Sequence, residues 1–206
     1  MPVLDFWAVM PTCAARNSVR LETQKKLNPH GIVPTMFACE TLSLTPRQRH
    51  NQNLADIGAQ FSERREPYLL YLEDDLDVAP TFHQWLTRAM LGELECVSFF
   101  NPNRNFYQPA VLKMLDNGKR PPASFYEAAG KGSWYSALAV LMSRRAFNEI
   151  WRHVDFAGDV SLDNAIPLAD VTLHCAVPNP IDHQDVPSAT SATHWGGRVR
   201  SISFDA

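Results

Sequence analysis

The sequence predicts an α/β fold: a single domain with a mostly parallel central sheet flanked by helices. Short apolar runs alternate along the chain with stretches whose apolar residues recur at helical spacing. The clearest apolar run, Tyr68 to Leu72, has the length and composition of a buried strand. With 206 residues, 45% of them hydrophobic and 20% charged, the chain can bury the core of one globular domain and does not resemble a disordered protein.

The first elements are expected in the order strand, helix, strand. Val3 to Met10 is an apolar strand, and Arg16 to Leu27 is polar enough for a surface helix, which Asn28 to Gly31 ends. Ile32 to Cys39 is a second strand. Pro34 places it at an edge of the sheet, because proline has no N–H for a ladder hydrogen bond.

The next helix has a recognisable start. Thr45 can cap it, Pro46 suits its first turn, and Gln48 completes a capping box. One face then carries apolar or small residues at i, i+3, i+4 and i+7, and the helix leads into the strand Tyr68 to Leu72. These residues are Leu54, Ile57, Gly58 and Phe61.

Two further helices and three strands are expected downstream. Pro80 and Thr81 open a helix, and Ser143 can cap another. The inward faces of these helices hold Phe82, Trp85, Leu86 and Ala89 in the first, and Phe147, Ile150, Trp151 and Val154 in the second. The strands are Glu95 to Phe100, Ala137 to Met142 and Val171 to Val177.

Two segments are expected to be irregular. Asn101 to Gly132 is rich in Asn, Pro, Gly and aromatic residues, and its length favours a site-building or lid segment over a simple connection. The tail from Pro178 is polar and rich in turn residues.

Three consecutive acids, Glu73, Asp74 and Asp75, follow the strand Tyr68 to Leu72 directly, at the end where α/β sheets build ligand sites. At ~4 Å, each pair of carboxylates costs about 1 kcal/mol in water and roughly 4 kcal/mol near a partly buried surface. A divalent cation would turn that repulsion into affinity, since Mg²⁺ and Mn²⁺ prefer oxygen ligands and often share them with substrate phosphates. A solvated acidic turn after a core strand is the alternative.

Charge and cysteine content narrow the classes of function. A formal net charge of −3 gives no bulk attraction to nucleic acid or an anionic membrane, although a local basic groove stays compatible with it. No apolar run approaches the ~20 residues that span a bilayer, and the N-terminus lacks the basic leader of a signal peptide. Four widely spaced cysteines without a Cys-x-x-Cys pair favour buried thiols in a reducing cytoplasm.

The segment LYLEDDLDVAPTF, Leu70 to Phe82, resembles the Asp-x-Asp element of GT-A-type glycosyltransferases. It is closest to the Leu-Glu-Asp-Asp form in lipopolysaccharide-type and small phage-encoded members. The resemblance implies a Rossmann-like domain with a nucleotide-sugar-binding half (1–100), an acceptor half (101–206) and a bound Mn²⁺ or Mg²⁺. It implies that Asp75 is the direct metal ligand, that Glu73 faces the ribose or nucleotide, and that Asp74 acts directly or through water.

The segment Gly132 to Phe147 is similar to the family's small-residue loop that enters a strand and then a helix. That loop lines the pocket for sugar and acceptor, and Trp134 and Tyr135 would supply flat faces for a sugar ring or base. The alternative is that both aromatic residues belong to the core.

The family commonly carries an acid under the acceptor, which in inverting members takes the proton from the attacking hydroxyl. Asp163 fits this position best and Asp159 is the runner-up. The alternative is that either carboxylate only caps a helix.

A late histidine completes the resemblance. Pro180-Ile181-Asp182-His183 is a degenerate form of the family's Pro-x-x-x-His element, which often returns a histidine to the metal. His183 is the first choice, and His194, beside Trp195, competes with it. Imidazole as a ligand favours Mn²⁺ over Mg²⁺. Arg16 follows the first strand, where the family often meets the nucleotide.

These features predict a metal-dependent glycosyltransferase that moves a sugar from a nucleotide-diphosphate-sugar donor to a hydroxyl. The acceptor would be a glycan, lipid-linked or free, a protein, or a hydroxymethylated base in DNA, and the outcome inverting or retaining. One alternative is a nucleotidyltransferase on a similar scaffold, but Pro11 to Arg20 lacks the glycine-rich phosphate loop expected after its first strand. The other is a non-enzymatic binding protein whose acids are surface decoration.

Overall fold

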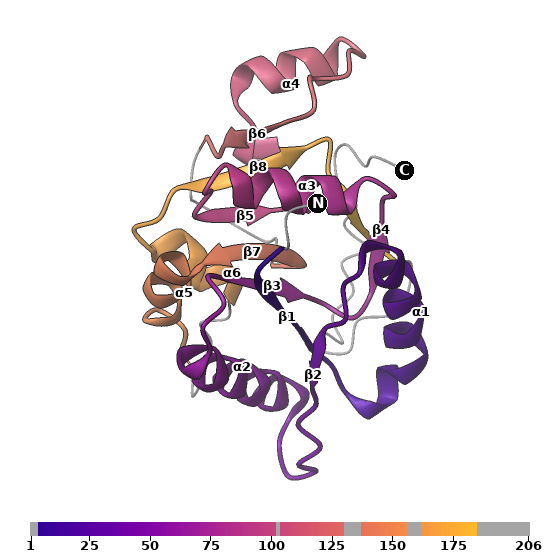
Figure 1. Ribbon diagram of the computed structural model, residues 1–206, viewed down its shortest axis with the longest axis vertical. Helices are drawn as coiled ribbons and strands as arrows, with labels where there is room; N and C mark the ends of the chain where they lie inside the picture. The colour runs from indigo at the N-terminus through magenta and orange to yellow at the C-terminus, as the bar shows by residue number, and fades with distance from the viewer. Residues whose placement is uncertain (1–3, 102–103, 130–136, 156–161, 185–206) are drawn as a thin grey trace.

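The computed structural model describes residues 4–101, 104–129, 137–155 and 162–184. Its centre is a seven-stranded sheet with the strand order β2-β1-β3-β7-β5-β8-β6, and β4 and β9 form a separate two-stranded sheet (Figure 1). In the large sheet β1, β2, β3, β5 and β8 run in one direction, and β7 and β6 run in the other. The predicted α/β class with a mostly parallel, Rossmann-like sheet is therefore confirmed.

The first part of the chain builds one half of the sheet, with parallel strands joined through helices. Its elements are β1 (Phe6–Pro11), η1 (Ala14–Arg16), α1 (Asn17–Leu27), η2 (Asn28–His30), β2 (Thr35–Phe37), α2 (Pro46–Glu63) and β3 (Tyr68–Leu72). Each was expected within a few residues except the two short 3₁₀ turns. As Pro34 predicts, β2 is an edge strand.

The second part adds the remaining strands. Its elements are β4 (Leu76–Val78), α3 (Phe82–Leu91), β5 (Cys96–Ser98), η3 (Arg104–Phe106), α4 (Pro109–Asp116), β6 (Ser124–Glu127), β7 (Ala139–Ser143), α5 (Arg144–Trp151), α6 (Leu162–Ala165), η4 (Ile166–Leu168), β8 (Leu173–Val177) and β9 (Ile181–His183).

Both predicted helix caps are present. The Thr45 hydroxyl accepts a hydrogen bond from the Gln48 N–H at 3.2 Å, and the Gln48 side chain accepts one from the Thr45 N–H at 2.9 Å. The Ser143 hydroxyl accepts from the Ala146 N–H at 3.2 Å and starts α5 directly after β7. Each cap fixes where a helix leaves the sheet.

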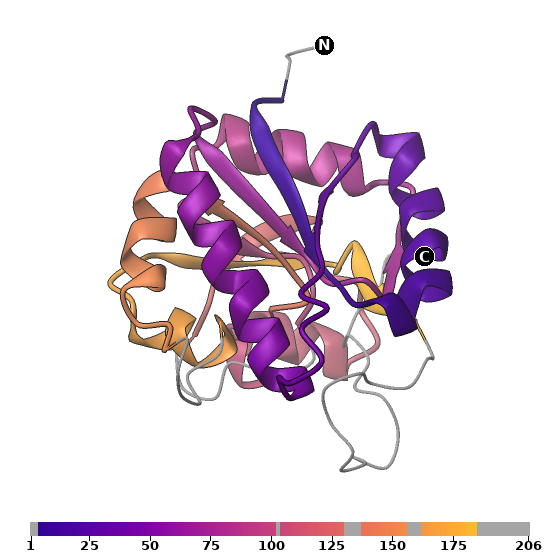
Figure 2. The same cartoon turned by 90° about the horizontal axis from the view of Figure 1, so that it is seen from below.

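Helices cover both faces of the large sheet (Figure 2). One face packs against α2, α5 and α6, through side chains such as Phe61, Phe147 and Leu162. The other face packs against α3 and the end of α1, through Phe82, Trp85 and Leu27. The predicted inward faces of α2 and α3 are buried. Since both faces are covered, exposed binding surface falls at the strand ends.

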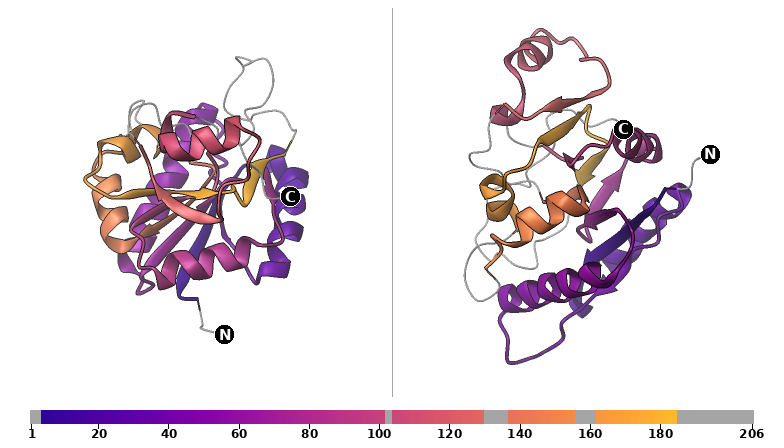
Figure 3. Two further views of the ribbon diagram at one scale, coloured as in Figure 1. Left: turned by 90° about the horizontal axis from the view of Figure 1, so that it is seen from above. Right: turned by 60° about the vertical axis from the view of Figure 1, so that its left-hand side comes forward.

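The expectation of an irregular Asn101–Gly132 segment is wrong in its middle. This stretch forms α4 and β6, and β6 pairs antiparallel with β8 at the far edge of the sheet. Figure 3 shows α4 at one end of the molecule and α2 at the other. A small apolar cluster of Tyr107, Val111 and Val177 attaches α4, so its stability comes from tertiary packing.

The start of the polar tail, from Pro178, includes a strand. Ile181–His183 forms β9, which pairs antiparallel with β4, and Leu76 lies opposite His183. Because of this pairing, β9 lies beside β4, which follows the three acids directly in the sequence.

Within the described residues, no helix combines the length and apolar character needed to cross a bilayer. None of the four cysteines is in a disulfide; Cys96 and Cys175 are buried, whereas Cys13 and Cys39 are half-buried. Burial raises the pKa of the Cys175 thiol to about 12, which makes it an inert core residue.

Candidate functional site

The three acids lie in a turn at the carboxyl end of β3, and backbone hydrogen bonds fix this turn. The Glu73 N–H donates to the Leu138 carbonyl at 2.8 Å. The Asp74 carbonyl accepts from the Thr23 hydroxyl at 2.8 Å, and the Asp75 carbonyl accepts from the Gln184 N–H at 2.8 Å. Three segments that are distant in the sequence therefore hold the backbone of the three acids in place.

Arg16 lies against two of the acids. Its Nε donates to Asp74 Oδ1 at 2.7 Å, and its Nη2 lies 2.8 Å from Asp75 Oδ2. The Thr12 hydroxyl donates to the second oxygen of Asp74 at 2.7 Å. Asp74 thus accepts on both oxygens, as an ionised carboxylate does.

Burial and charge oppose each other at this ion pair. Burial raises the pKa of Asp74, and the charge of Arg16 and the Thr12 hydrogen bond act against that rise. At Arg16, burial alone would lower the pKa, but the charges of Asp74 and Asp75 outweigh it and the pKa is raised. The ion pair and the Thr12 hydrogen bond thus favour the charged forms of Asp74 and Arg16, against the effect of burial.

His183 meets Asp75 from the opposite side. Its Nδ1 lies 3.7 Å from Asp75 Oδ1, and the Phe100 ring packs edge-on against the imidazole with the ring centroids 5.0 Å apart. The β4–β9 pairing sets the position of His183, and the end of β5 supports its ring. Of the two candidate histidines, His183 thus lies next to Asp75, and His194 lies outside the described residues.

Glu73 and Asp163 form a second acidic pair. Burial raises the pKa of Glu73 well above its usual value, and the negative charges of Asp75, Asp163 and Asp74 raise it further, against the opposing charge of Arg16. One oxygen of Asp163 accepts a hydrogen bond from the Ala137 N–H at 2.6 Å. Asp163 lies in the first turn of the short helix α6.

The structure therefore brings together the predicted site residues that it describes. Arg16, Asp74, Asp75 and His183 form one connected group, and Glu73 and Asp163 lie next to it. The other predicted residues, which are Trp134, Tyr135, Asp159 and His194, lie outside the described residues.

Several polar residues that support the group of Arg16, the aspartates and His183 were not predicted from the sequence. Thr12 binds Asp74, and Thr23 binds both the Asp74 carbonyl and the Leu76 N–H. The Gln184 side chain donates to the Thr23 hydroxyl at 2.9 Å and to the Leu76 carbonyl at 2.8 Å. Of these residues, only Thr12 could have been proposed from the sequence, because its hydroxyl follows the first strand directly.

The donor set suits a divalent cation in part. Among the described residues, no group of three or more His, Cys, Asp and Glu side chains is arranged to hold a metal. Asp75 Oδ1 and His183 Nδ1 are 3.7 Å apart, and two ligands at ~2.1 Å from one ion are at most about 4.2 Å apart. One carboxylate and one imidazole fit an ion whose remaining ligands are substrate phosphates and water.

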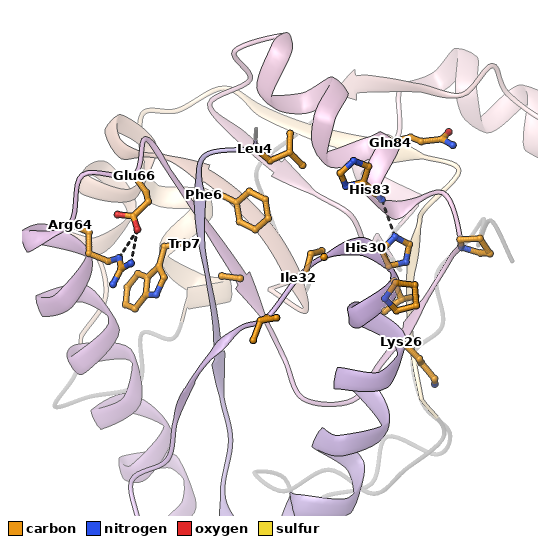
Figure 4. Close-up of a pocket in the computed structure, with 16 residues that line it drawn as sticks. Leu4, Phe6, Trp7, Lys26, His30, Ile32, Arg64, Glu66, His83 and Gln84 are labelled. Carbon is orange, nitrogen blue, oxygen red and sulfur yellow. Dashed lines mark hydrogen bonds and ion pairs between the residues drawn. The ribbon is translucent and has the colours of Figure 1, made fainter. Parts of the chain in front are cut away.

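A large cavity lies elsewhere on the molecule. It has a volume of about 1000 Å³, and its lining includes Leu4 and Phe6 at the start of β1 and His30 in η2. Figure 4 shows His83 donating to His30 on one side and Arg64 beside Glu66 on the other. The acids follow the carboxyl end of β3, which runs parallel to β1, so the cavity lies at the opposite end of these strands.

No protein-family model and no curated protein matches the chain. Among solved structures, A197 from STIV superimposes with a TM-score of 0.53 and 10% identity, over 87% of this chain and 85% of that chain. A glycosyltransferase involved in the glycosylation of the major capsid of PBCV-1 gives a TM-score of 0.44 at 10% identity, over 84% and 81%. The inositol-1-phosphate CTP transferase from T. maritima gives 0.41 at 10% identity, over 91% and 73%. The likeness to A197 concerns the fold alone, and the two lower scores say nothing about the chemistry of this chain.

Proposed function

We propose that this chain is a metal-dependent glycosyltransferase that moves a sugar from a nucleotide-diphosphate-sugar to a hydroxyl acceptor. The observation that carries the proposal is the meeting of Asp75 and His183 at the carboxyl end of β3, with their side-chain atoms 3.7 Å apart. The same edge of the sheet presents Arg16, a buried cation suited to a phosphate. Carboxylate and imidazole can bind a divalent cation, and a guanidinium can bind the phosphates of the donor.

In this proposal Asp75 and His183 hold Mn²⁺ or Mg²⁺. When bound, the metal neutralises the charge that develops on the leaving diphosphate. Arg16 faces the donor phosphates from the side of α1, and Glu73 faces the ribose or nucleotide. Trp134 and Tyr135 would line the sugar and acceptor pocket, as the sequence predicts. Each of these roles is a proposal, and the ion pairs of Arg16 support its placement beside the donor.

Asp163 is the proposed general base of an inverting reaction. Its hydrogen bond from the Ala137 N–H orients the carboxylate near the other acids. Its second oxygen would take the proton of the attacking hydroxyl at the moment of transfer. In a retaining reaction Asp163 would have no such role.

The acceptor is proposed by chemical class only. Glycan hydroxyls, lipid-linked or free, and the hydroxymethyl group of a modified base in DNA both provide the nucleophile that the reaction needs. The formal net charge of −3 favours a glycan, because nothing in the overall charge attracts DNA.

The first loop favours sugar transfer over nucleotidyl transfer. The short 3₁₀ turn η1 and the start of α1 follow β1, and no glycine occurs from Pro11 to Arg20. A nucleotidyltransferase loop that wraps the phosphates with backbone N–H groups needs glycine there. Here the charged side chain of Arg16 occupies that place instead.

Calorimetry with UDP-, GDP- and CMP-sugars, each with and without Mn²⁺, tests the proposed function. We expect one donor class to bind in the presence of Mn²⁺ and to bind at least tenfold more weakly without it. If no donor binds under either condition, the proposed function is wrong. Mass spectrometry of the donor that binds, incubated with glycan acceptors and with hydroxymethylated DNA, then identifies the acceptor class.

A further inference from the structure

Arg16 is placed so that it competes with a divalent cation for the same carboxylate. Its Nη2 lies 2.8 Å from Asp75 Oδ2, while the other oxygen of Asp75 faces His183 Nδ1 at 3.7 Å. A metal held by Asp75 and His183 would therefore share one carboxylate group with a guanidinium. The second contact of Arg16, from Nε to Asp74 Oδ1 at 2.7 Å, holds that guanidinium in place.

Little solvent screens these charges. The side chains of Arg16 and Asp75 are 11% and 6% exposed. Two ionised aspartates and one arginine leave a net charge of −1 for this group, so that adding a divalent cation alone makes it +1. A diphosphate would supply the missing negative charge and would also give the guanidinium a second anion to bind.

We propose that Arg16 makes metal binding at Asp75 conditional on the diphosphate of the donor. Without a donor, Arg16 neutralises Asp75 and keeps the affinity for the metal low. When the diphosphate arrives, Arg16 shifts part of its bonding to the phosphates, and the metal and donor bind as a coupled pair. Asp74 is then a positioning residue, which holds the guanidinium between the Asp75 carboxylate and the phosphates of the donor. This inference rests on the proposed function.

The test measures Mn²⁺ binding, with activity left aside. Electron paramagnetic resonance of free Mn²⁺ gives the Mn²⁺ affinity of the full chain, alone and with saturating UDP, GDP or CDP. For the wild type we expect one nucleotide to tighten Mn²⁺ binding by about tenfold or more. For Arg16→Gln we expect Mn²⁺ alone to bind about tenfold more tightly than to the wild type. The nucleotide effect should then shrink by a similar factor.

Three further variants keep the result interpretable. Arg16→Lys retains the positive charge and should keep the weak metal binding of the wild type. Lys25→Gln removes the same charge from an exposed site on α1 and should change nothing. Arg16→Gln/Asp74→Asn removes the Arg16–Asp74 ion pair, keeps the net charge, and should bind Mn²⁺ alone more tightly than the wild type, because no guanidinium then shares the Asp75 carboxylate. This double variant takes Arg16 away from one buried carboxylate, whereas Arg16→Gln takes it away from two, so the double variant is less prone to misfold.

The outcomes distinguish a failure of the proposed role of Arg16 from a failure of the proposed function. If the wild type shows the nucleotide effect and neither Arg16→Gln nor the double variant binds Mn²⁺ alone more tightly, the role of Arg16 is refuted and the proposed function stands. If Lys25→Gln tightens Mn²⁺ binding as much as Arg16→Gln does, overall charge explains the effect and the specific role of Arg16 is refuted. If no variant binds Mn²⁺ with any nucleotide, both proposals fail.

Discussion

His183 Nδ1 lies 3.7 Å from Asp75 Oδ1, although the two residues are far apart in the sequence. The contact exists because β9 pairs antiparallel with β4, which begins at Leu76, immediately after Asp75. The Gln184 N–H, directly after β9, donates a hydrogen bond to the Asp75 carbonyl at 2.8 Å. The late histidine is thus fixed beside the acids by backbone pairing, and its own side chain does not have to hold it there.

The first prediction concerns Asp75. Asp75→Ala should lower Mn²⁺-dependent donor hydrolysis by about 100-fold or more, because the charge on the leaving diphosphate would lose its stabilisation. Release of the nucleoside diphosphate, followed over time, measures this rate. Asp77→Asn is the control: Asp77 pairs with Lys26 in a partly exposed ion pair, so removing its charge should leave the rate within twofold of the wild type. A rate unchanged in Asp75→Ala would remove this residue from the site.

His183 should set the preference between metals. Imidazole favours Mn²⁺ over Mg²⁺, whereas an amide oxygen does not, so His183→Asn should lower activity with Mn²⁺ much more than activity with Mg²⁺. The ratio of kcat/KM with the two metals is the measurement. Equal losses with both metals would show that His183 is not a ligand.

Asp163→Asn separates donor binding from transfer. An asparagine oxygen can still accept the hydrogen bond from the Ala137 N–H, so the fold and donor binding should persist. Loss of the general base should lower transfer by roughly 10²- to 10⁴-fold. Calorimetry gives the donor affinity and mass spectrometry the rate of transfer. Retained transfer would contradict the assignment of Asp163 as the base.

The contact between α2 and α5 predicts a stability effect far from the site. A Cβ atom at Gly58 would lie 2.2 Å from Trp151 Nε1, so Gly58→Ala should destabilise the protein by about 1–3 kcal/mol through overpacking. Urea unfolding measures this change. Gln60→Ala, at an exposed position of the same helix, should stay within about 0.5 kcal/mol. Equal stability of both variants would show that the two helices separate at little cost.

Partly buried histidines should lower the stability of the fold in mild acid. Burial lowers the pKa of His174 below its ordinary value of 6.5, against the opposing charges of Glu127 and Glu95, and burial also lowers the pKa values of His30 and His50. Below pH 6.5 these histidines therefore bind more protons in the unfolded chain than in the folded one. Their contribution to stability should be fully present above that pH and be lost as the pH drops toward the folded pKa values.

The melting temperature between pH 7.5 and pH 5 measures this decline, and these two pH values bracket roughly the unperturbed histidine range. His174→Gln should flatten the decline, whereas His153→Gln, at an exposed position, should leave its slope unchanged. An identical slope in all three proteins would exclude His174 as a cause.

Local signals in the sequence predicted most of the elements. The capping box at Thr45, the strand Tyr68–Leu72 and the apolar face of α3 each depend on residues within two turns or one strand, and each is present. The strand β6 and the helix α4 were missed for the opposite reason. They are short, partly exposed, and stabilised by the neighbouring β8 and a small distant cluster.

The sequence by itself determined the fold class, the position of the acids at the end of a buried strand, and the candidates Asp75, Asp163 and His183. Periodicity and strand composition are local properties, so they can be read without the fold. Only the tertiary structure decided that Arg16 bridges Asp74 and Asp75, and that His183 lies opposite Leu76. Those contacts depend on the register of strands and on the direction in which buried side chains point. Both are set when distant segments pack together and bury their charges in one place.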